Sequence, residues 1–269
     1  MGQPASRSRY RLARRSEGAC PPADADSRRS VAGYSPRRCL TTDRRLRCAD
    51  AVLGLELPGQ PDEPLRVLAL GCHADDIEIG AGGLLLRLQE TRPRLAVHWV
   101  VFSALGARRD EARSSAEDLL DRVGSLQVDL HEFRDGYFPY VGAEVKDVFE
   151  ALKDSPAPDL ILTHHRQDLH QDHRLICELT WNTFRNHLVL EYEIPKYDGD
   201  LGRPNVFVPV SEEHCRRKVG VLMEHFGSQR DKHWFSADLF LGLMRLRGME
   251  SRSATGYAEA FHGRKLVLQ

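Results

Sequence analysis

The chain has 269 residues, of which 41% are hydrophobic, and a formal net charge of -1. This length accommodates one large domain or two small ones, and the hydrophobic content supports a real core. Because the sequence contains no run of about 18 apolar residues, we expect no transmembrane helix. From residue 51 onward, 34 acidic residues outnumber 26 basic ones, so we expect no nucleic-acid partner.

Six cysteines are scattered along the chain without a C-x-x-C pair. This pattern argues against a zinc ribbon and against a disulfide scaffold. We therefore expect a reducing, cytoplasmic setting. Cys72 adjoins His73 and could be a soft metal ligand or a nucleophile. We favour the interpretation that it is a small buried residue at the end of a strand.

Residues 1–62 form a leader rich in Arg, Ser, Ala and Pro. Its first 50 residues carry 12 Arg, no Lys and 5 acidic residues, and they lack the apolar centre of a secretory signal. We interpret the leader as disordered or loosely attached. A misassigned start is the favoured origin, with an organellar transit peptide and a basic tail for acidic partners as alternatives.

From residue 63 onward, strand-like and helix-like segments alternate. We expect strands at 65–71, 95–102, 128–133, 159–164, 188–194 and 205–210. We expect helices at 80–91, 110–123, 143–153, 173–187, 211–226 and 236–247. Runs such as V-L-A-L lack alternation, which is typical of strands buried on both faces. The sequence therefore predicts an α/β fold: a single domain over 63–269 whose Rossmann-like, largely parallel sheet is covered by helices on both faces.

Two polar clusters each follow an expected strand. The first, C-H-A-D-D-I-E-I-G-A-G-G, occupies residues 72–83, and the second, H-Q-D-H, occupies 170–173. Open α/β sheets bind their ligands at the carboxyl ends of the strands, so both clusters are expected at that edge. A histidine and two adjacent carboxylates at the end of a buried strand are costly to bury. Together, the clusters predict one divided metal site and therefore an enzyme.

The residue types and their spacing fit a catalytic zinc site. Such a site takes three histidine or carboxylate ligands and leaves a position for water. His73 and Asp76 are three residues apart and can both point inward from a tight turn, and His173 can complete the set. Asp75 is then close to the metal without being needed as a ligand, which suits a general base.

Other residues of the clusters have candidate roles as well. His170 could donate to a developing oxyanion or protonate a leaving group, and Asp172 could orient a histidine. The glycines of the first cluster are partly similar to a dinucleotide-binding motif. That motif, G-x-G-x-x-G, requires a glycine at position 85, where this chain has Leu85. Each cluster also has a purely structural alternative. Residues 75–76 could form an ordinary turn with a helix cap, and residues 170–173 could form a solvated loop.

These motifs resemble the PIG-L/LmbE-like family of zinc-dependent N-acetylglucosaminyl deacetylases. The family motif A-H-P-D-D-x-x-x-G-x-G-G is matched by residues 72–83, and H-x-D-H-R is matched by 170–174. The segment Tyr257–Phe261 is similar to the family's carboxyl-terminal signature. Ala74 replaces the usual proline and Cys72 replaces a small residue, but neither change removes a reacting group.

The resemblance implies a hydrolase that removes the N-acetyl group from an amino sugar or glycoconjugate and releases acetate. By resemblance, the ligands of Zn²⁺, or alternatively of Fe²⁺, are His73, Asp76 and His173. The implied catalytic residues are Asp75 as the base, His170 at the tetrahedral intermediate and Asp172 as the partner of His170. Arg109 resembles a family arginine near the substrate.

Two rival functions stay open. One is the hydrolysis of another sugar-linked amide, such as a thiol conjugate, by the same residues. The other is a sugar-binding module whose catalytic site has decayed, although intact His73, Asp75, Asp76 and His173 argue against it. We expect a small-molecule N-acetylated sugar or glycoconjugate as partner, and the sequence is compatible with a homo-oligomer.

Overall fold

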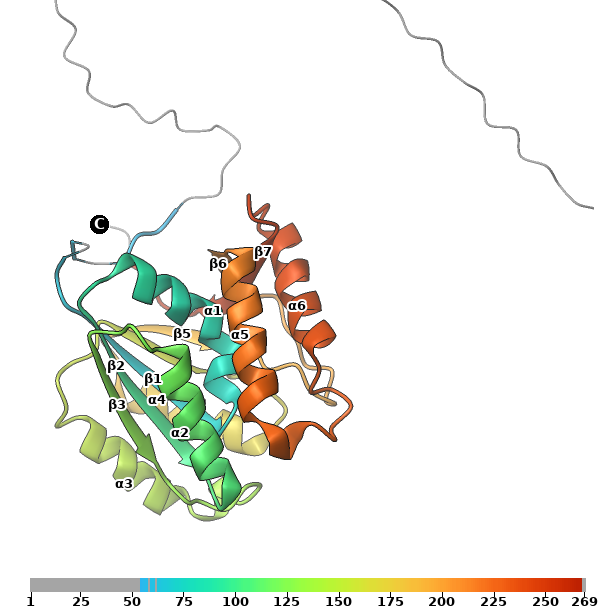
Figure 1. The fold of residues 1–269 in the computed structure, drawn as a ribbon. Coiled ribbons are helices and arrows are strands. Elements are labelled where there is room, and N and C mark those ends of the chain that lie inside the picture. The colour runs from blue at the N-terminus through green and yellow to red at the C-terminus, as the bar shows by residue number, and fades with distance from the viewer. Residues whose placement is uncertain (1–53, 58, 61, 268–269) are drawn as a thin grey trace, which may run out of the picture. The chain divides into compact units, whose positions relative to one another are not determined.

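The computed structural model describes residues 54–57, 59–60 and 62–267 (Figure 1). Most of the leader expected at residues 1–62 lies outside this range, so its character and the boundary at residue 63 remain predictions. Among the described residues, no helix combines the length and apolar character that a membrane span requires.

In the described part of the chain, seven strands form one sheet in the order β3-β2-β1-β4-β5-β7-β6 (Figure 1). Their bounds are β1 Leu65–His73, β2 Leu95–Ser103, β3 Ser125–Leu130, β4 Leu160–His164, β5 Leu188–Tyr192, β6 Val206–Val210 and β7 Tyr257–Gly263. Strands β1 to β5 pair in parallel, whereas β7 runs antiparallel to both β5 and β6. The expected α/β fold with a largely parallel sheet is confirmed.

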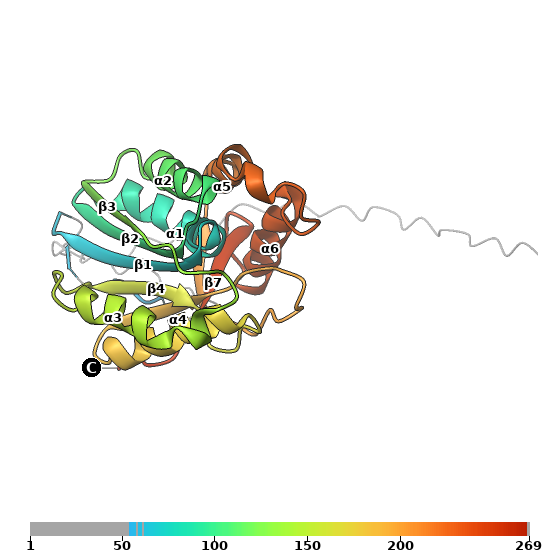
Figure 2. The same cartoon turned by 90° about the horizontal axis from the view of Figure 1, so that it is seen from below.

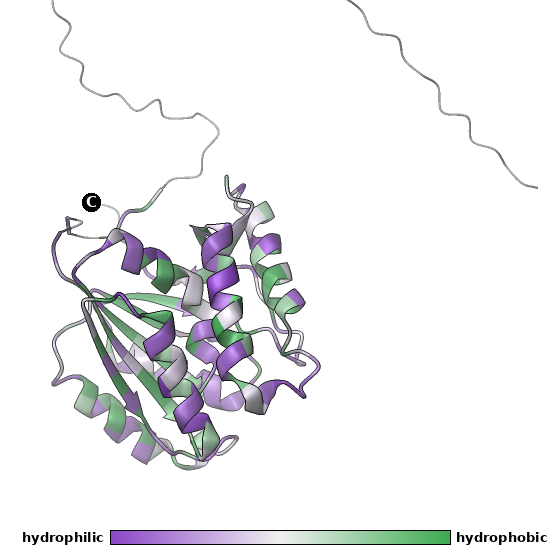
Figure 3. Cartoon of the chain, in the orientation of Figure 1, coloured by the Kyte–Doolittle hydropathy of each residue, from purple (hydrophilic) through white to green (hydrophobic). Residues whose placement is uncertain are grey.

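Helices cover both faces of the sheet, as expected. Helices α1, α2, α5 and α6 pack on one face, and α3 and α4 pack on the other (Figure 2). Their bounds are α1 Asp76–Thr91, α2 Ala107–Leu119, α3 Gly142–Leu152, α4 Gln171–Thr183, α5 Glu212–His225 and α6 Ala237–Glu250. The apolar residues concentrate in the strands and on the inward helix faces (Figure 3).

Two differences from the expected elements have physical reasons. Helix α1 begins at Asp76, four residues before the expected start, and its first turn buries the carboxylates of Asp76 and Glu78 between the apolar side chains Ile77 and Ile79. Because charged residues stand at these positions, the sequence does not show the apolar spacing that indicates a helix. Strand β7 was not among the expected strands, although its sequence Y-A-E-A-F alternates and it fills the place between β5 and β6.

Gly80 allows α1 to pack closely against the end of β5. A Cβ atom at Gly80 would lie 2.2 Å from Tyr192 Cδ2, and the Tyr192 side chain is fully buried. The Tyr192 hydroxyl donates a hydrogen bond to Leu70 O at 2.6 Å and lies 3.2 Å from His164 Nε2. This glycine therefore has a packing role that connects α1, β5 and the end of β4.

We expect Gly80→Ala to destabilise the protein, because the added methyl group overlaps the Tyr192 ring. Overpacking of this kind costs about 1–3 kcal/mol or more in the free energy of unfolding. Gly220→Ala is the matched control, since a Cβ there meets no atom of the described residues within 4 Å. The control should stabilise α5 by about 0.5–1 kcal/mol. Thermal unfolding that gives both variants the same Tm would contradict the packing role of Gly80.

Candidate active site

The two polar clusters meet at the switch point of the sheet. Strands β1 and β4 are neighbours, but β1 leads to β2 on one side and β4 leads to β5 on the other. Open α/β sheets bind ligands at this point, beyond the carboxyl ends of the strands. His73 ends β1 and Asp76 begins α1, while His170 precedes α4 and His173 lies in its first turn. The expected convergence of the clusters is present.

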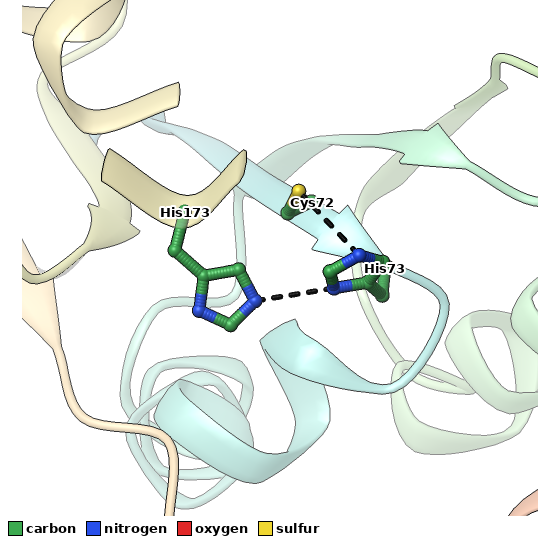
Figure 4. A group of neighbouring side chains, drawn as sticks. All are labelled: Cys72, His73 and His173. Atoms are coloured by element: carbon green, nitrogen blue, oxygen red, sulfur yellow. Dashed lines mark hydrogen bonds between the residues drawn. The ribbon is translucent and has the colours of Figure 1, made fainter. Parts of the chain in front are cut away.

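Three of these side chains bring one ligand atom each to a common point. His73 Nδ1 lies 3.1 Å from His173 Nε2 (Figure 4). Asp76 Oδ2 lies 3.4 Å from His73 Nδ1 and 3.6 Å from His173 Nε2. A tetrahedral metal ion with bonds of about 2.0–2.1 Å separates its ligand atoms by about 3.3 Å. The three atoms therefore have the spacing that such an ion requires.

Carboxylates on the far side of both imidazoles fix which nitrogen carries the proton. His73 Nε2 lies 2.9 Å from Asp135 Oδ1, and His173 Nδ1 lies 2.9 Å from Asp168 Oδ2. An ionised carboxylate only accepts hydrogen bonds, so these nitrogens donate and the opposite nitrogens of neutral rings carry lone pairs. Burial, followed by the charge of His164, lowers the pKa of His173 to about 3. The facing nitrogens, His73 Nδ1 and His173 Nε2, can share one proton, and a cation bound between them would take its place.

Asp75 lies beside the three ligand atoms but has a different partner. Its Oδ1 accepts a hydrogen bond from Arg108 Nη2 at 2.8 Å. Burial raises the pKa of Asp75, and the charge of Asp76 adds to this effect, while Arg108 opposes it. A buried carboxylate with a raised pKa suits a group that takes up and returns a proton.

The arginine that reaches this cluster is Arg108, whereas the sequence indicated Arg109. Arg109 Nη1 instead donates to Leu130 O and Glu132 Oε1, at 3.2 and 3.1 Å. Successive residues of a helix point about 100° apart, so neighbours in the first turn of α2 reach different surroundings. Arg108 therefore contacts the cluster directly, while the role of Arg109 near the substrate stays a prediction.

His170 and Asp172 lie close together, but Asp172 has other hydrogen-bond partners. The ligand atoms of both residues lie within 4.8 Å of one another. The buried Asp172 carboxylate accepts hydrogen bonds from Gly136 N at 2.5 Å and Phe138 N at 3.1 Å. It thus holds the loop that carries Asp135 against α4, while His170 keeps a partly exposed ring beside the cluster.

Asp168 holds both histidines of the second cluster. Its Oδ2 accepts from His173 Nδ1, and its Oδ1 accepts from the backbone nitrogen of His170 at 2.7 Å. Lys196 Nζ lies 3.0 Å from Asp168 Oδ2 and 2.5 Å from Asp200 Oδ2. Asp200 in turn accepts from Leu169 N. The loop after β5 is therefore tied to the loop after β4.

His164, at the end of β4, packs against the cluster. Its ring stacks on His173 with centroids 3.9 Å apart, and its Nε2 lies 2.9 Å from Cys72 N and 3.3 Å from Asp76 Oδ2. His164 therefore packs directly against His173 and Asp76. Cys72 is buried, and burial raises the pKa of its thiol to about 12. This agrees with a small buried residue at the strand end.

Five further residues, not singled out from the sequence, contact the predicted ones directly or, in the case of Lys196, through Asp168. They are Arg108, Asp135, His164, Asp168 and Lys196. Position relative to the strands could have found some of them, because His164 ends β4 and Asp135 follows β3 at the same edge of the sheet. Lys196 gave no such signal, since it lies in an irregular loop.

Exposed apolar side chains gather in the loops around the candidate site. Each lies in the segment that follows one of the strands β2 to β5. They are Leu105, Tyr137, Tyr140, Leu169, Tyr197 and Leu201. Aromatic and aliphatic surface at a polar site suits a ligand with apolar faces, as sugar rings have.

Part of this chain matches a known protein family. Residues 68–184 match the model of the PIG-L family, described as GlcNAc-PI de-N-acetylase. The uncharacterized deacetylase YaiS of Escherichia coli strain K12 is 27% identical over 190 residues, which cover 65% of this chain and 98% of that protein.

Solved structures share the fold at low sequence identity. The N,N'-diacetylchitobiose deacetylase of Pyrococcus horikoshii is 19% identical, with a TM-score of 0.56 over 73% of this chain and 82% of that chain. The zinc-inhibited form of teicoplanin deacetylase Orf2 is 17% identical, with a TM-score of 0.55 over 73% of this chain and 96% of that chain.

A hydratase shares the fold as well. The 4-carboxy-2-hydroxymuconate hydratase GalB of Pseudomonas putida is 18% identical, with a TM-score of 0.58 over 76% of this chain and 98% of that chain. The fold alone therefore does not identify the reaction. The match to the PIG-L family model, over residues 68–184, includes both polar clusters, so this part of the chain is similar to that family.

Proposed function

We propose that this protein hydrolyses the N-acetyl group of an N-acetylated amino sugar or glycoconjugate and releases acetate. In this proposal His73, Asp76 and His173 hold Zn²⁺, with Fe²⁺ as the alternative. The observation that carries it is the convergence of His73 Nδ1, Asp76 Oδ2 and His173 Nε2, with a second carboxylate, that of Asp75, beside them. That combination suits hydrolysis of an amide, which needs an electrophile and a base.

When bound, the metal ion would polarise the acetyl carbonyl and lower the pKa of a water molecule. Asp75 accepts the proton of the water that attacks the carbonyl carbon. Its hydrogen bond to Arg108 fixes the direction of the carboxylate. Burial raises the pKa of Asp75, so the carboxylate binds a proton more tightly than an exposed aspartate does.

The proton then moves to the leaving nitrogen, so that the carbon–nitrogen bond breaks and a free amine leaves with acetate. Asp75 returns the proton it accepted, or His170 supplies one. The partly exposed His170 ring also can donate a hydrogen bond to the oxygen of the tetrahedral intermediate. Arg108, which contacts Asp75, joins Arg109 as an arginine that we propose near the substrate.

A panel of substrates tests the proposal directly. Purified protein, stripped of metal and reloaded with one equivalent of Zn²⁺, should release acetate from at least one N-acetylated sugar or glycoconjugate. The matching N-propionyl and N-benzoyl compounds separate deacetylation from general amide hydrolysis. Absence of acetate from free, nucleotide-linked and lipid-linked N-acetyl sugars, with bound zinc verified, would refute the proposed reaction.

Asp75 and Asp76 should respond differently to the same substitution. Asp75→Asn preserves the shape and should retain metal while kcat falls by about 10²–10⁴-fold, the usual contribution of a general base. Asp76→Asn should weaken metal binding, with activity partly restored by added zinc, as should His173→Ala. Metal content and kcat of all three variants check this. Loss of metal from Asp75→Asn together with its retention by Asp76→Asn would reverse the assignment.

Asp168 should act on metal affinity through His173. Asp168→Asn removes the charge that accepts the hydrogen bond from His173 Nδ1. Loss of a carboxylate that orients a metal-binding histidine typically lowers metal affinity by about 10–100-fold. The control is Asp159→Asn, because Asp159 also accepts a backbone hydrogen bond, from Arg66 N at 2.8 Å, but at the opposite edge of the sheet. Competition with a chelator measures both variants. Equal metal affinities for the two would remove Asp168 from the metal site.

A further inference from the structure

A groove with an excess of basic side chains runs beside the second half of α4. It encloses about 500 Å³ and is formed where three segments distant in the sequence meet. Its basic residues are Arg166, Arg185, Arg264 and Lys265, with Trp181 and Asn182 between them. Glu178 is the single carboxylate among its lining residues. We call it the Trp181 groove.

A buried carboxylate beneath the groove fixes its parts in place. Glu191 is only 1% exposed. It accepts hydrogen bonds from Trp181 Nε1 at 2.6 Å and from Arg166 N at 3.0 Å. Arg264 lies 3.7 Å from the same carboxylate and stacks on the Trp181 ring, 4.2 Å from its centroid. The groove is therefore organised before any ligand arrives, which lowers the entropic cost of binding.

Its remaining charges lack carboxylate partners. Among the described residues, the guanidinium groups of Arg166 and Arg185 contact no carboxylate, and Arg185 Nε donates only to Asn182 O. Lys265 Nζ donates to the backbone oxygen of Arg185. Four basic side chains thus face two carboxylates, Glu178 and Glu191, so an anion in the groove would relieve the repulsion among the basic groups.

We propose that the Trp181 groove is a binding site for a small organic phosphate. A guanidinium group can donate two parallel hydrogen bonds to a phosphate. The groove holds more basic side chains than a ligand with a single carboxylate would need. A volume of about 500 Å³ falls in the range of small-molecule sites and greatly exceeds that of a phosphate ion alone. Trp181 supplies an apolar wall for the organic part of the ligand.

This site is separate from the metal cluster and does not depend on the proposed reaction. His173 lies in the first turn of α4, and Trp181 lies eight residues later, about 12 Å along the helix axis. The residues of the groove take no part in the metal cluster described above.

Binding to the full-length, zinc-loaded protein tests the proposal. Isothermal titration calorimetry with UMP, UDP and glucose 1-phosphate, at about 0.15 M NaCl to screen diffuse attraction, should give saturable binding of at least one of them. Uridine and glucose should not bind. Absence of saturable binding by all three phosphates at millimolar concentration would overturn the proposal. Binding to phosphatidic acid vesicles without binding to soluble phosphates would also overturn it.

The double variant Arg166→Gln/Arg185→Gln should bind the phosphate at least about tenfold more weakly, since two charge-assisted contacts are lost. The control, Arg122→Gln/Arg216→Gln, removes the same charge from side chains that are 79% and 70% exposed elsewhere, and should change the affinity less than about twofold. Equal weakening in both would show surface attraction and overturn the site. If the first double variant fails to fold, Arg185→Gln alone, at an exposed position, should still weaken binding measurably.

Discussion

The candidate site depends on one carboxylate that is shared by two histidines. Asp168 accepts from the His173 ring through one oxygen and from the His170 backbone through the other. Although burial opposes its ionisation, the hydrogen bond from His173 and the nearby charges lower the pKa of Asp168, so it stays charged. A charged acceptor holds His173 in one tautomer, with Nε2 free to bind a metal ion. Through the backbone hydrogen bond of His170, Asp168 also fixes the start of α4 and the position of His170.

The sequence was sufficient to predict the parts of the site that strand ends determine. His73 and His173 could be expected to meet, because β1 and β4 carry them to the same edge of a parallel sheet. The choice between Arg108 and Arg109 could not be made in the same way. It depends on the rotation of α2 at its first turn, and helix boundaries read from a sequence are uncertain by more than the one residue that separates them.

Contacts from irregular loops were beyond prediction for a different reason. Lys196 reaches Asp168 because the loop after β5 folds back on the loop after β4, and no periodic pattern describes such a path. Asp135 and its neighbours are held by Asp172, whose role we had expected to concern His170. The motif thus singled out Asp172, while the hydrogen-bond partners of this residue are set by the tertiary fold.

Packing behind the site constrains its chemistry as well. Gly80 admits the Tyr192 ring, Tyr192 reaches the end of β4, and His164 there stacks on His173. A side chain in place of the glycine would press on this stack and so on a proposed ligand. The glycine near a carboxylate motif, which in other sequences signals a phosphate loop, serves here to bring a helix close to the sheet.

The balance of charge explains why these buried groups favour a divalent cation. Five carboxylates surround the two facing imidazoles, namely Asp75, Asp76, Asp135, Asp168 and Asp172. The lysine and arginine side chains in direct ion-pair contact with them are Arg108 and Lys196, among the described residues. A surplus of negative charge in a buried region is costly, and protonation or a bound cation relieves it. Since the hydrogen bonds of Asp135 and Asp168 direct His73 Nδ1 and His173 Nε2 to the same point as Asp76 Oδ2, a metal ion at that point satisfies the charge and the geometry together.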